Sequence, residues 1–381
     1  MFIVVLYFVA TLAEACSFDE VNFDSKFSGG RLSRCQQLTS LHYSLHIVPE
    51  NEPVNPSPWY NFKVSSKKNQ KLTIELNFND NYPRYLPKIS VDGEHWQNIA
   101  FTTQGKTMVI QLDVSEQSLW VAAQEPIDNP FYDKWLAKLH AQDNEALVQR
   151  LGLSTEKRPI DALVRKNPLS KEWLVVIGRQ HPPEVTGAMA LFSFVESLLA
   201  DSDVAKQFRQ RFNLIIIPNL NPDGVAAGNW RHNAKGVDLN RDWKTFEQVE
   251  SKLVRDKLAT IVEAGDKIVF ALDFHSTYHD VFYTMPKDYT VAPALLVTDW
   301  IAGIKNRTKW VFNPLVKAGT NPEAGVFKQF IADTYQVHAV TYEVGDNTNR
   351  EEISYVAKQA AQELMLQLSN TTAAAFAVPL H

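Results

Sequence analysis

The stretch Leu174-Val175-Val176-Ile177-Gly178-Arg179-Gln180-His181-Pro182-Pro183-Glu184 decides the fold. Its first four residues form a continuous apolar run, which is typical of a strand buried on both faces of a sheet. A helical pattern follows at residues 188–199, and further apolar runs come at residues 214–217, 268–272 and 339–342, with helical segments among them. This alternation predicts an α/β domain with a mixed, mostly parallel sheet flanked by helices.

Polar side chains follow each of the four predicted strands. His181 and Glu184 come after the first run, and the segment 219–224 comes after the second. The third run ends in Asp273 and His275, and the fourth ends in Glu343. Ligands of open α/β sheets bind at the carboxyl ends of the strands, so we expect these side chains to converge on one crevice.

His181, Glu184 and His275 have side chains of the types that bind zinc. Zinc takes imidazole and carboxylate ligands, and a catalytic site keeps its fourth position for water. His181 and Glu184 are three residues apart at a strand end, so both can contact one ion, with His275 as the third ligand. A His-x-x-Glu pair alone is weak evidence, because a histidine after a strand is more often a hydrogen-bonded structural residue, so the case for a metal depends on the next segment.

The next segment of the chain adds several motifs, and their order can be compared with that of a known family. It contains Asn221-Pro222-Asp223-Gly224, then Arg231, then Gly236-Val237-Asp238-Leu239-Asn240-Arg241. Together with the His-x-x-Glu pair, Asp273-Phe274-His275-Ser276 and Glu343, these motifs resemble the zinc carboxypeptidase family, the carboxypeptidase A-like metallopeptidases. The matches cover residues 174–346. Weaker similarity to the β-sandwich of the cytosolic-carboxypeptidase-like branch lies in Phe23-Asp24-Ser25, in residues 59–64 and in residues 129–132.

The resemblance implies a zinc metallocarboxypeptidase, a metalloprotease and hydrolase that acts on peptide bonds. One Zn²⁺ per chain would be held by His181, Glu184 and His275. The substrates would be the C-termini of peptides or proteins. No nucleic acid is expected as a partner, and the oligomeric state is not predicted.

The resemblance also assigns the catalytic and substrate-binding residues. Glu343 would be the general base for a zinc-activated water and would pass the proton to the leaving amine. Arg231 would stabilise the tetrahedral oxyanion. Asn240 and Arg241 would bind the terminal carboxylate of the substrate, Arg241 with a bidentate fork. Asp273 fits either a carboxylate that orients the ligand His275 or a purely structural residue.

One departure concerns the mobile tyrosine that the archetypal carboxypeptidases place some twenty residues before the catalytic Glu. Residues 318–325 read AGTNPEAG and contain no tyrosine. The residue that closes over the substrate is therefore unassigned, and so is the pocket for its side chain. Neither Lys317 nor Lys328 can be assigned to acidic substrates from the sequence.

Two alternative functions remain open. The metal triad and the Asp-x-Asn-Arg segment also resemble those of zinc amidases that act on acyl-amino acids or cell-wall peptides. A non-catalytic member of the family would bind peptides without cleaving them. Loss of a ligand or of the general base would mark such a member, and all four residues are present.

The first third of the chain has a different pattern. Residues 41–121 alternate between polar and apolar side chains in short runs, which predicts half-buried strands. We therefore expect a β-sandwich domain at residues 16–125. We expect a signal peptide before it, at residues 1–15. After it we expect a zinc carboxypeptidase-like catalytic domain at 126–370 and a C-terminal tail at 371–381. The sandwich either buttresses the catalytic domain or binds protein or carbohydrate.

The N-terminus predicts export. Residues 1–15 are apolar and end in Ala13-Glu14-Ala15, a small-x-small pattern, although no Lys or Arg precedes the apolar run. We expect a periplasmic or secreted protein; the alternative is a buried first strand. Cleavage after Ala15 would expose Cys16, but Glu14 argues against a lipoprotein anchor. A Cys16–Cys35 disulfide is compatible with export.

Composition excludes several other classes. The 381 residues are 45% hydrophobic and 21% charged, unlike collagen, coiled-coil or disordered chains. A net charge of −5 without a basic block argues against nucleic-acid binding. Two cysteines are too few for a disulfide scaffold or an all-cysteine zinc site. Beyond the N-terminus no apolar stretch is long enough to span a bilayer, so we expect no transmembrane segment in the mature chain.

Overall fold

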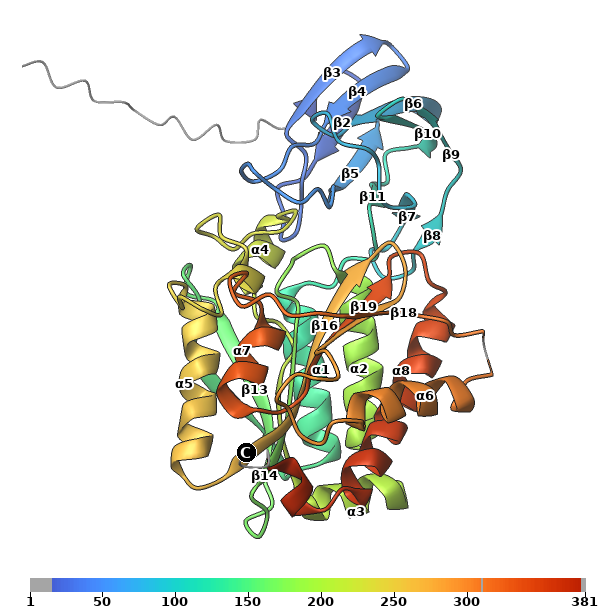
Figure 1. Cartoon of the computed structure of the whole chain (residues 1–381). Helices are drawn as coiled ribbons and strands as arrows, with labels where there is room; N and C mark the ends of the chain where they lie inside the picture. The colour runs from blue at the N-terminus through green and yellow to red at the C-terminus, as the bar shows by residue number, and fades with distance from the viewer. Residues whose placement is uncertain (1–15, 310, 378–381) are drawn as a thin grey trace, which may run out of the picture. The chain divides into compact units, whose positions relative to one another are not determined.

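The structure is a computed structural model that describes residues 16–309 and 311–377. The predicted signal peptide at residues 1–15 lies outside the described residues. The chain divides between Pro126 and Ile127 into two compact units. The first is all-β and the second is α/β, as Figure 1 shows. The predicted fold class, an α/β domain preceded by a smaller all-β region, is confirmed.

The first unit is a sandwich of two sheets. One sheet has the strand order β1 (Cys16–Ser17), β2 (Val21–Asp24), β5 (Asn61–Ser66), β11 (Leu119–Ala122), β7 (Lys88–Ser90) and β8 (Gln97–Asn98). The other has the order β3 (Arg34–Thr39), β4 (His42–His46), β6 (Gln70–Asn77), β10 (Thr107–Val114) and β9 (Phe101–Gln104).

Alternation of side chains along the strands makes the core of this sandwich. In β6, Leu72, Ile74 and Leu76 are fully buried, while the residues between them are partly exposed. Phe23 of the first sheet packs against Tyr43 of the second, with ring centroids 5.3 Å apart. A disulfide between Cys16 and Cys35 joins β1 to β3. The two sheets therefore share one apolar interior.

The second unit is built on an eight-stranded mixed sheet. Its strand order is β12 (Ala146–Leu153), β13 (Pro159–Arg165), β15 (Phe212–Ile217), β14 (Glu172–Gly178), β16 (Lys267–Thr277), β19 (Ala339–Gly345), β17 (Val281–Thr284) and β18 (Leu315–Ala318). The four central strands, β15, β14, β16 and β19, are parallel. They contain the four apolar runs that the sequence analysis placed in strands.

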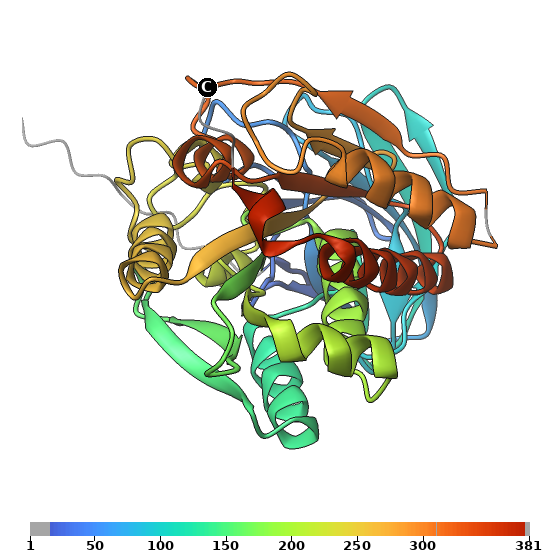
Figure 2. The same ribbon diagram turned by 60° about the horizontal axis from the view of Figure 1, so that its bottom comes forward.

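Helices cover both faces of this sheet (Figures 1 and 2). One face carries α1 (Asn129–Gln142), α2 (Val185–Leu198), α3 (Asp203–Arg211), α6 (Leu296–Arg307) and α8 (Arg350–Asn370). The other carries α5 (Val249–Glu263) and α7 (Phe327–Tyr335). Shorter turns are α4 (Pro222–Ala227), η1 (Leu239–Arg241) and η2 (Ala373–Phe376). The described part of the predicted tail contains η2, whose Phe376 is buried.

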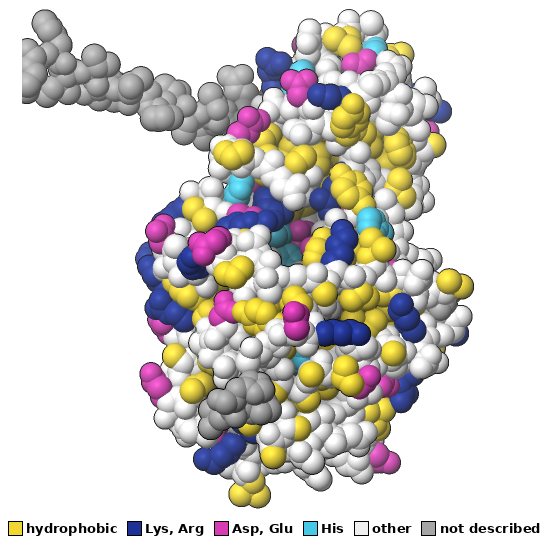
Figure 3. All heavy atoms as spheres, in the orientation of Figure 1, with side chains coloured by type: hydrophobic (Ala, Val, Ile, Leu, Met, Phe, Trp, Pro, Cys, Tyr) yellow, Lys and Arg dark blue, Asp and Glu magenta, His cyan; other side chains and the backbone are white. Residues whose placement is uncertain are grey.

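The helices pack against the sheet through buried apolar side chains. Phe270 of β16 packs edge-on against Trp300 of α6, and Val175 of β14 belongs to the cluster under α5 and α7. No single described helix is both long and apolar enough to cross a membrane; α2 and α3 reach that measure only jointly, with a bend of 86° between them. Acidic and basic side chains are interspersed over the face that Figure 3 shows.

Strand register determines which residues meet at the carboxyl end of the sheet. His275 of β16 is the direct partner of Glu343 in β19, and Phe274 is the partner of Gly178 at the end of β14. The segments that follow β14, β16 and β19 therefore leave the sheet at the same edge, as the sequence analysis expected.

Helix α2 lies unusually close to this edge at Gly187. A Cβ at position 187 would lie 2.5 Å from the carbonyl oxygen of His275, whereas the present backbone N–H donates to Ser276 Oγ at 2.8 Å. Only glycine allows this approach of helix to strand. The helix that follows Glu184 is thereby held directly against β16.

Replacement of Gly187 tests this close approach. Alanine is favoured over glycine in a helix by about 1 kcal/mol, but in Gly187→Ala the overpacking against the His275 backbone outweighs that gain. We expect the free energy of unfolding, measured by urea denaturation, to fall by about 1–3 kcal/mol. Gly319→Ala is the control, because a Cβ there meets nothing within 4 Å. Equal stability of the two variants would contradict the close approach.

Candidate metal centre and active site

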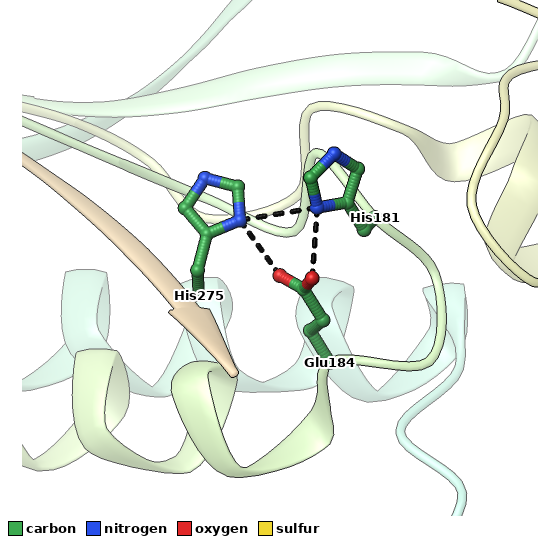
Figure 4. Close-up of side chains that lie close together, drawn as sticks. All are labelled: His181, Glu184 and His275. Atoms are coloured by element: carbon green, nitrogen blue, oxygen red, sulfur yellow. Dashed lines mark hydrogen bonds and ion pairs between the residues drawn. The ribbon is translucent and has the colours of Figure 1, made fainter. Parts of the chain in front are cut away.

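Three side chains converge at the carboxyl ends of β14 and β16 (Figure 4). His181 comes from the loop after β14, Glu184 is the N-cap residue of α2, and His275 lies in β16. Their exposed fractions are 3%, 5% and 1%. One ligand atom from each lies within 4.8 Å of the others. The structure thus brings together the three residues that the sequence analysis proposed as metal ligands.

A strained turn directs the His181 loop into this cluster. Arg179 has a φ of 54°, in the left-handed region that non-glycine residues seldom adopt. Its side chain stabilises the turn, since Nε donates to the carbonyl oxygen of Pro182 and Nη1 donates to the hydroxyl of Tyr132, both at 2.8 Å. The 129–132 motif of the sequence analysis therefore supports the loop of the site through Tyr132.

Each histidine is backed by a carboxylate on the side that faces away from Glu184. His181 Nε2 lies 2.9 Å from Asp238 Oδ1, and His275 Nε2 lies 2.8 Å from Asp273 Oδ2. Because a carboxylate accepts, each Nε2 donates a proton, and each Nδ1 keeps its lone pair toward the centre. Such carboxylate partners orient metal-binding imidazoles. Asp273 therefore takes the orienting position that the sequence analysis considered.

The centre of the cluster favours a positive charge. The two Nδ1 atoms are 3.2 Å apart, and the Glu184 oxygens lie 2.8 Å from Nδ1 of His181 and 2.7 Å from Nδ1 of His275. With neutral imidazoles, these atoms are all acceptors and repel one another unless a cation lies among them. Two imidazole nitrogens and a carboxylate form a donor set that zinc prefers in open sites. The residues fit a zinc ion.

The pKa directions agree with this charge preference. Burial alone would raise the pKa of Glu184, but His181 and His275 hold it well below its usual value. Burial alone would lower the pKa of His275, but Asp273 and Glu184 raise it well above its usual value. Both directions favour a positive charge between Glu184 and the two imidazoles.

Glu343 lies next to this cluster through the register of β19 with β16. Its Oε2 atom is buried and has no hydrogen-bond partner among the described residues. Burial, followed by repulsion from Glu184, raises the pKa of Glu343 to about 7. In the metal-free chain, Glu343 is therefore a partly buried residue with one fully buried carboxylate oxygen, and it can accept and release a proton near neutral pH.

The loop around η1 brings further predicted residues to the site. Arg231 Nε donates to Asp238 Oδ2 at 2.7 Å, so one carboxylate contacts both Arg231 and His181. Asn240 Oδ1 accepts from the backbone N–H of Phe327 at 2.9 Å, which leaves the donor end of the amide, Nδ2, 3.4 Å from His275 Nε2.

Arg241 is the most exposed of the predicted residues. Its side chain is 51% exposed, and Nη1 donates to the Asn240 carbonyl oxygen at 2.7 Å. Lys328, which the sequence left unassigned, is buried: its Nζ donates to the carbonyl oxygens of Thr284 at 3.0 Å and Gly319 at 2.6 Å. The backbone therefore occupies at least two of the three protons of this ammonium group.

Sequence reasoning missed two polar residues that hold the site. Asp238 stood inside a quoted motif, but no role was assigned to it; its place two residues before Asn240 at the start of η1 is the signal that was available. Gln180 precedes His181, and its Nε2 donates to Asp273 Oδ2 at 2.7 Å, while its Oε1 accepts from Trp243 at 2.8 Å. No pattern in the sequence predicts the hydrogen bonds of Gln180 with Asp273 and Trp243.

Known families match both units of the chain. Residues 132–380 match the family described as Zinc carboxypeptidase, and residues 23–123 match the family described as Cytosolic carboxypeptidase N-terminal domain. Both resemblances stated from the motifs are confirmed.

Curated relatives point to the same branch. An uncharacterized protein of Zymomonas mobilis is 27% identical over 67% of this chain and 67% of its own length. Cytosolic carboxypeptidase 6 of Mus musculus and of Homo sapiens are both 26% identical over 58% of this chain. The matches cover 46% of the mouse protein and 49% of the human one, so this chain spans about half the length of these relatives.

Solved structures share the fold over nearly the whole chain. A metallo-carboxypeptidase from Burkholderia cenocepacia has a TM-score of 0.78 at 21% identity and covers 91% of this chain and 98% of its own. A metallo-carboxypeptidase from Pseudomonas aeruginosa, solved with (2-guanidinoethylmercapto)succinic acid, has a TM-score of 0.76 at 22% identity, with the same coverage of both chains.

The comparisons correct one prediction and settle the family. The expectation of an exported protein is contradicted, because the N-terminal family and the mammalian relatives are those of cytosolic carboxypeptidases. An apolar run at residues 1–15 without a preceding basic residue is not sufficient evidence of a signal peptide. From residue 132 onward the matched sequence, the mixed sheet and the His-Glu-His cluster agree, and this chain belongs to the zinc carboxypeptidase family.

Proposed function

We propose that this chain is a zinc-dependent metallocarboxypeptidase that hydrolyses the C-terminal peptide bond of peptides or proteins. The observation that carries the proposal is Glu343. Its Oε2 atom is buried without a hydrogen-bond partner among the described residues, and in the sheet Glu343 pairs with His275, one of three converging side chains that could hold a metal ion. A carboxylate oxygen without a partner beside such a cluster fits a general base.

His181, Glu184 and His275 would hold one Zn²⁺. When bound, zinc lowers the pKa of water and polarises a carbonyl group. Asp238 and Asp273 hold both imidazole rings with Nδ1 directed to the centre, so the ligands are oriented before an ion binds.

Glu343 moves the proton in this mechanism. Its carboxylate takes a proton from the attacking water and passes it to the nitrogen of the leaving amino acid. The orphaned Oε2 atom supplies the acceptor that this transfer requires.

Three residues bind the rest of the substrate. Arg231, which Asp238 orients, stabilises the negative charge that develops on the carbonyl oxygen. Asn240 presents its Nδ2 donor, and Arg241 presents a half-exposed guanidinium group, to the terminal carboxylate of the peptide. A free carboxylate at the C-terminus is thus the feature that the site selects.

We further propose that these roles reside in a catalytic domain at residues 126–370, preceded by a separate sandwich domain at 16–125 and followed by a tail at 371–381. Support comes from the division of the chain between Pro126 and Ile127.

Replacement of the general base tests the mechanism. In Glu343→Gln, we expect kcat/KM for a free-acid peptide to fall by about 10²- to 10⁴-fold, because the amide cannot take the proton. Bound zinc, measured by elemental mass spectrometry, should stay at the wild-type level. Glu351→Gln on the surface of α8 is the matched control. Unchanged hydrolysis in Glu343→Gln would refute the assignment, and wild-type hydrolysis of acyl-amino acids but not of peptides would favour a zinc amidase.

Removal of the guanidinium group tests the recognition of the terminal carboxylate. In Arg241→Ala, we expect KM for free-acid peptides to rise by about 10- to 100-fold, the effect of one lost charge-assisted pair, with a smaller change in kcat. Arg255→Ala on α5 is the control. C-terminally amidated peptides should be poor substrates of the wild type, and equal hydrolysis of amidated and free-acid peptides would contradict the proposal.

The raised pKa of Glu343 also predicts a pH dependence of stability in the metal-free protein. The folded state binds the Glu343 proton up to about pH 7, whereas the unfolded chain loses it near the ordinary value for Glu, so stability falls as the pH rises between these values. Glu343→Gln removes this loss. At pH 8 we expect the variant to be more stable than the wild type by on the order of 1–3 kcal/mol in urea unfolding, and at pH 4 the two should agree. A constant difference across this range would contradict the raised pKa.

A further inference from the structure

Gln180, the residue before His181, is a fully buried amide with three polar partners. Its Nε2 atom donates to Asp273 Oδ2 at 2.7 Å, and its Oε1 atom accepts from the indole nitrogen of Trp243 at 2.8 Å. Its backbone carbonyl oxygen accepts from Asn221 Nδ2 at 3.0 Å. The side chain and the backbone of Gln180 are thus both held by hydrogen bonds.

Trp243 determines which end of the Gln180 amide faces Asp273. An indole N–H can only donate, so the oxygen of the amide faces Trp243. The NH₂ end then faces the carboxylate of Asp273, which only accepts. A flipped amide would bring donor against donor and acceptor against acceptor, and both groups would be buried without a partner. The chemistry of the two partners therefore fixes Gln180 as a donor to Asp273.

Asp273 has few other donors. Its Oδ2 atom accepts from Gln180 Nε2 and lies 2.8 Å from His275 Nε2. Its Oδ1 atom is buried and has no hydrogen-bond partner among the described residues. A fully buried carboxylate is stable only with the donors that surround it. Among the described residues, Gln180 therefore supplies one of the two side-chain contacts that hold this carboxylate in place.

Two further segments of the chain hold Gln180. Asn221 is the N-cap residue of α4, and its Oδ1 accepts from the backbone N–H of Gly224 at 2.9 Å. The same amide binds the Gln180 backbone, which gives the motif at residues 221–224 a place in the site. Trp243 packs against Phe327 of α7, with ring centroids 4.7 Å apart. Gln180 is therefore fixed from both sides.

We propose that Gln180 is a positioning residue of the metal centre: its amide holds the Asp273 carboxylate, which in turn orients the ring of His275. This role rests on the proposed function, because it concerns the binding of zinc. Without the amide donor, Asp273 keeps only its contact with His275, and both side chains gain freedom that zinc binding must remove. The affinity for the metal falls for this reason.

Replacement of Gln180 by methionine tests this role, because methionine has a similar shape and cannot donate. In Gln180→Met, we expect the dissociation constant of zinc to rise by about threefold to tenfold, the effect of one hydrogen bond. It is measured on the full chain by competition with a chromophoric chelator. The visible absorption of the Co²⁺-loaded chain should also change, because it depends on the geometry of the ligands.

A second variant guards against misfolding. In Gln180→Asn the amide is one methylene shorter and is withdrawn from Asp273, while the site stays polar. We expect the zinc dissociation constant to rise in this variant as well.

Asn213→Leu is the matched control. Asn213 is also fully buried, donates to the carbonyl oxygen of Ser170 at 3.1 Å and accepts from the backbone N–H of Asn167 at 2.8 Å. It lies near the start of β15, at the end of the sheet away from the metal centre. Both amide replacements should lower the midpoint of urea unfolding, but only that of Gln180 should change the zinc affinity and the Co²⁺ absorption.

The outcomes separate this role from the proposed function. Wild-type zinc affinity in a folded Gln180 variant, or an equal loss of affinity in Asn213→Leu, would overturn the positioning role alone. Absence of zinc binding by the wild type would overturn the proposed function and the positioning role together.

Discussion

The parallel register of β16 with β19 places His275 and Glu343 side by side at the buried end of two strands. That pairing brings a carboxyl group next to a ligand imidazole where little water is left, and the pKa of Glu343 rises for this reason. A slip of one residue would turn either side chain to the opposite face of the sheet. The close contact of α2 with β16 at Gly187 then fixes Glu184 against the same strand end. The chemistry of the site therefore depends on backbone pairing before any side chain is considered.

Around this pairing, carboxylates alternate with the imidazole rings of the two histidines. Asp238 and Asp273 lie outside the two histidines, and Glu184 lies between them. The cluster carries more negative than positive groups unless a cation is present, which explains why the pKa of His275 rises in the metal-free chain. Gln180 belongs to the same arrangement. A buried carboxylate that orients a histidine must itself be held in place, and Gln180 donates to Asp273.

Much of the fold and the site follows from local patterns in the sequence. The four apolar runs predict the central strands because a strand covered on both faces excludes polar residues, and the polar ends of those strands predict His181, Glu184, His275 and Glu343 as neighbours. Gln180 could not be found in this way, because its role comes from contacts with Asp273 and Trp243 that are remote in sequence. The export prediction was wrong, and an apolar run without a preceding basic residue is weak evidence of a signal peptide. Strand order, and with it the pairing of β16 with β19, also lies beyond any local pattern.

Asp238 has a consequence for the energetics of the site. One oxygen of this carboxylate contacts His181, a candidate metal ligand. The other accepts a hydrogen bond from the guanidinium group of Arg231. The roles proposed above for His181, which would hold the metal ion, and for Arg231, which would stabilise the oxyanion, thus depend on one carboxylate. The free-energy effects of substitutions at His181 and Arg231 will not add, and only a double-mutant cycle can separate them. In the proposed mechanism, a substitution of Arg231 that displaces Asp238 would therefore also disturb the orientation of His181.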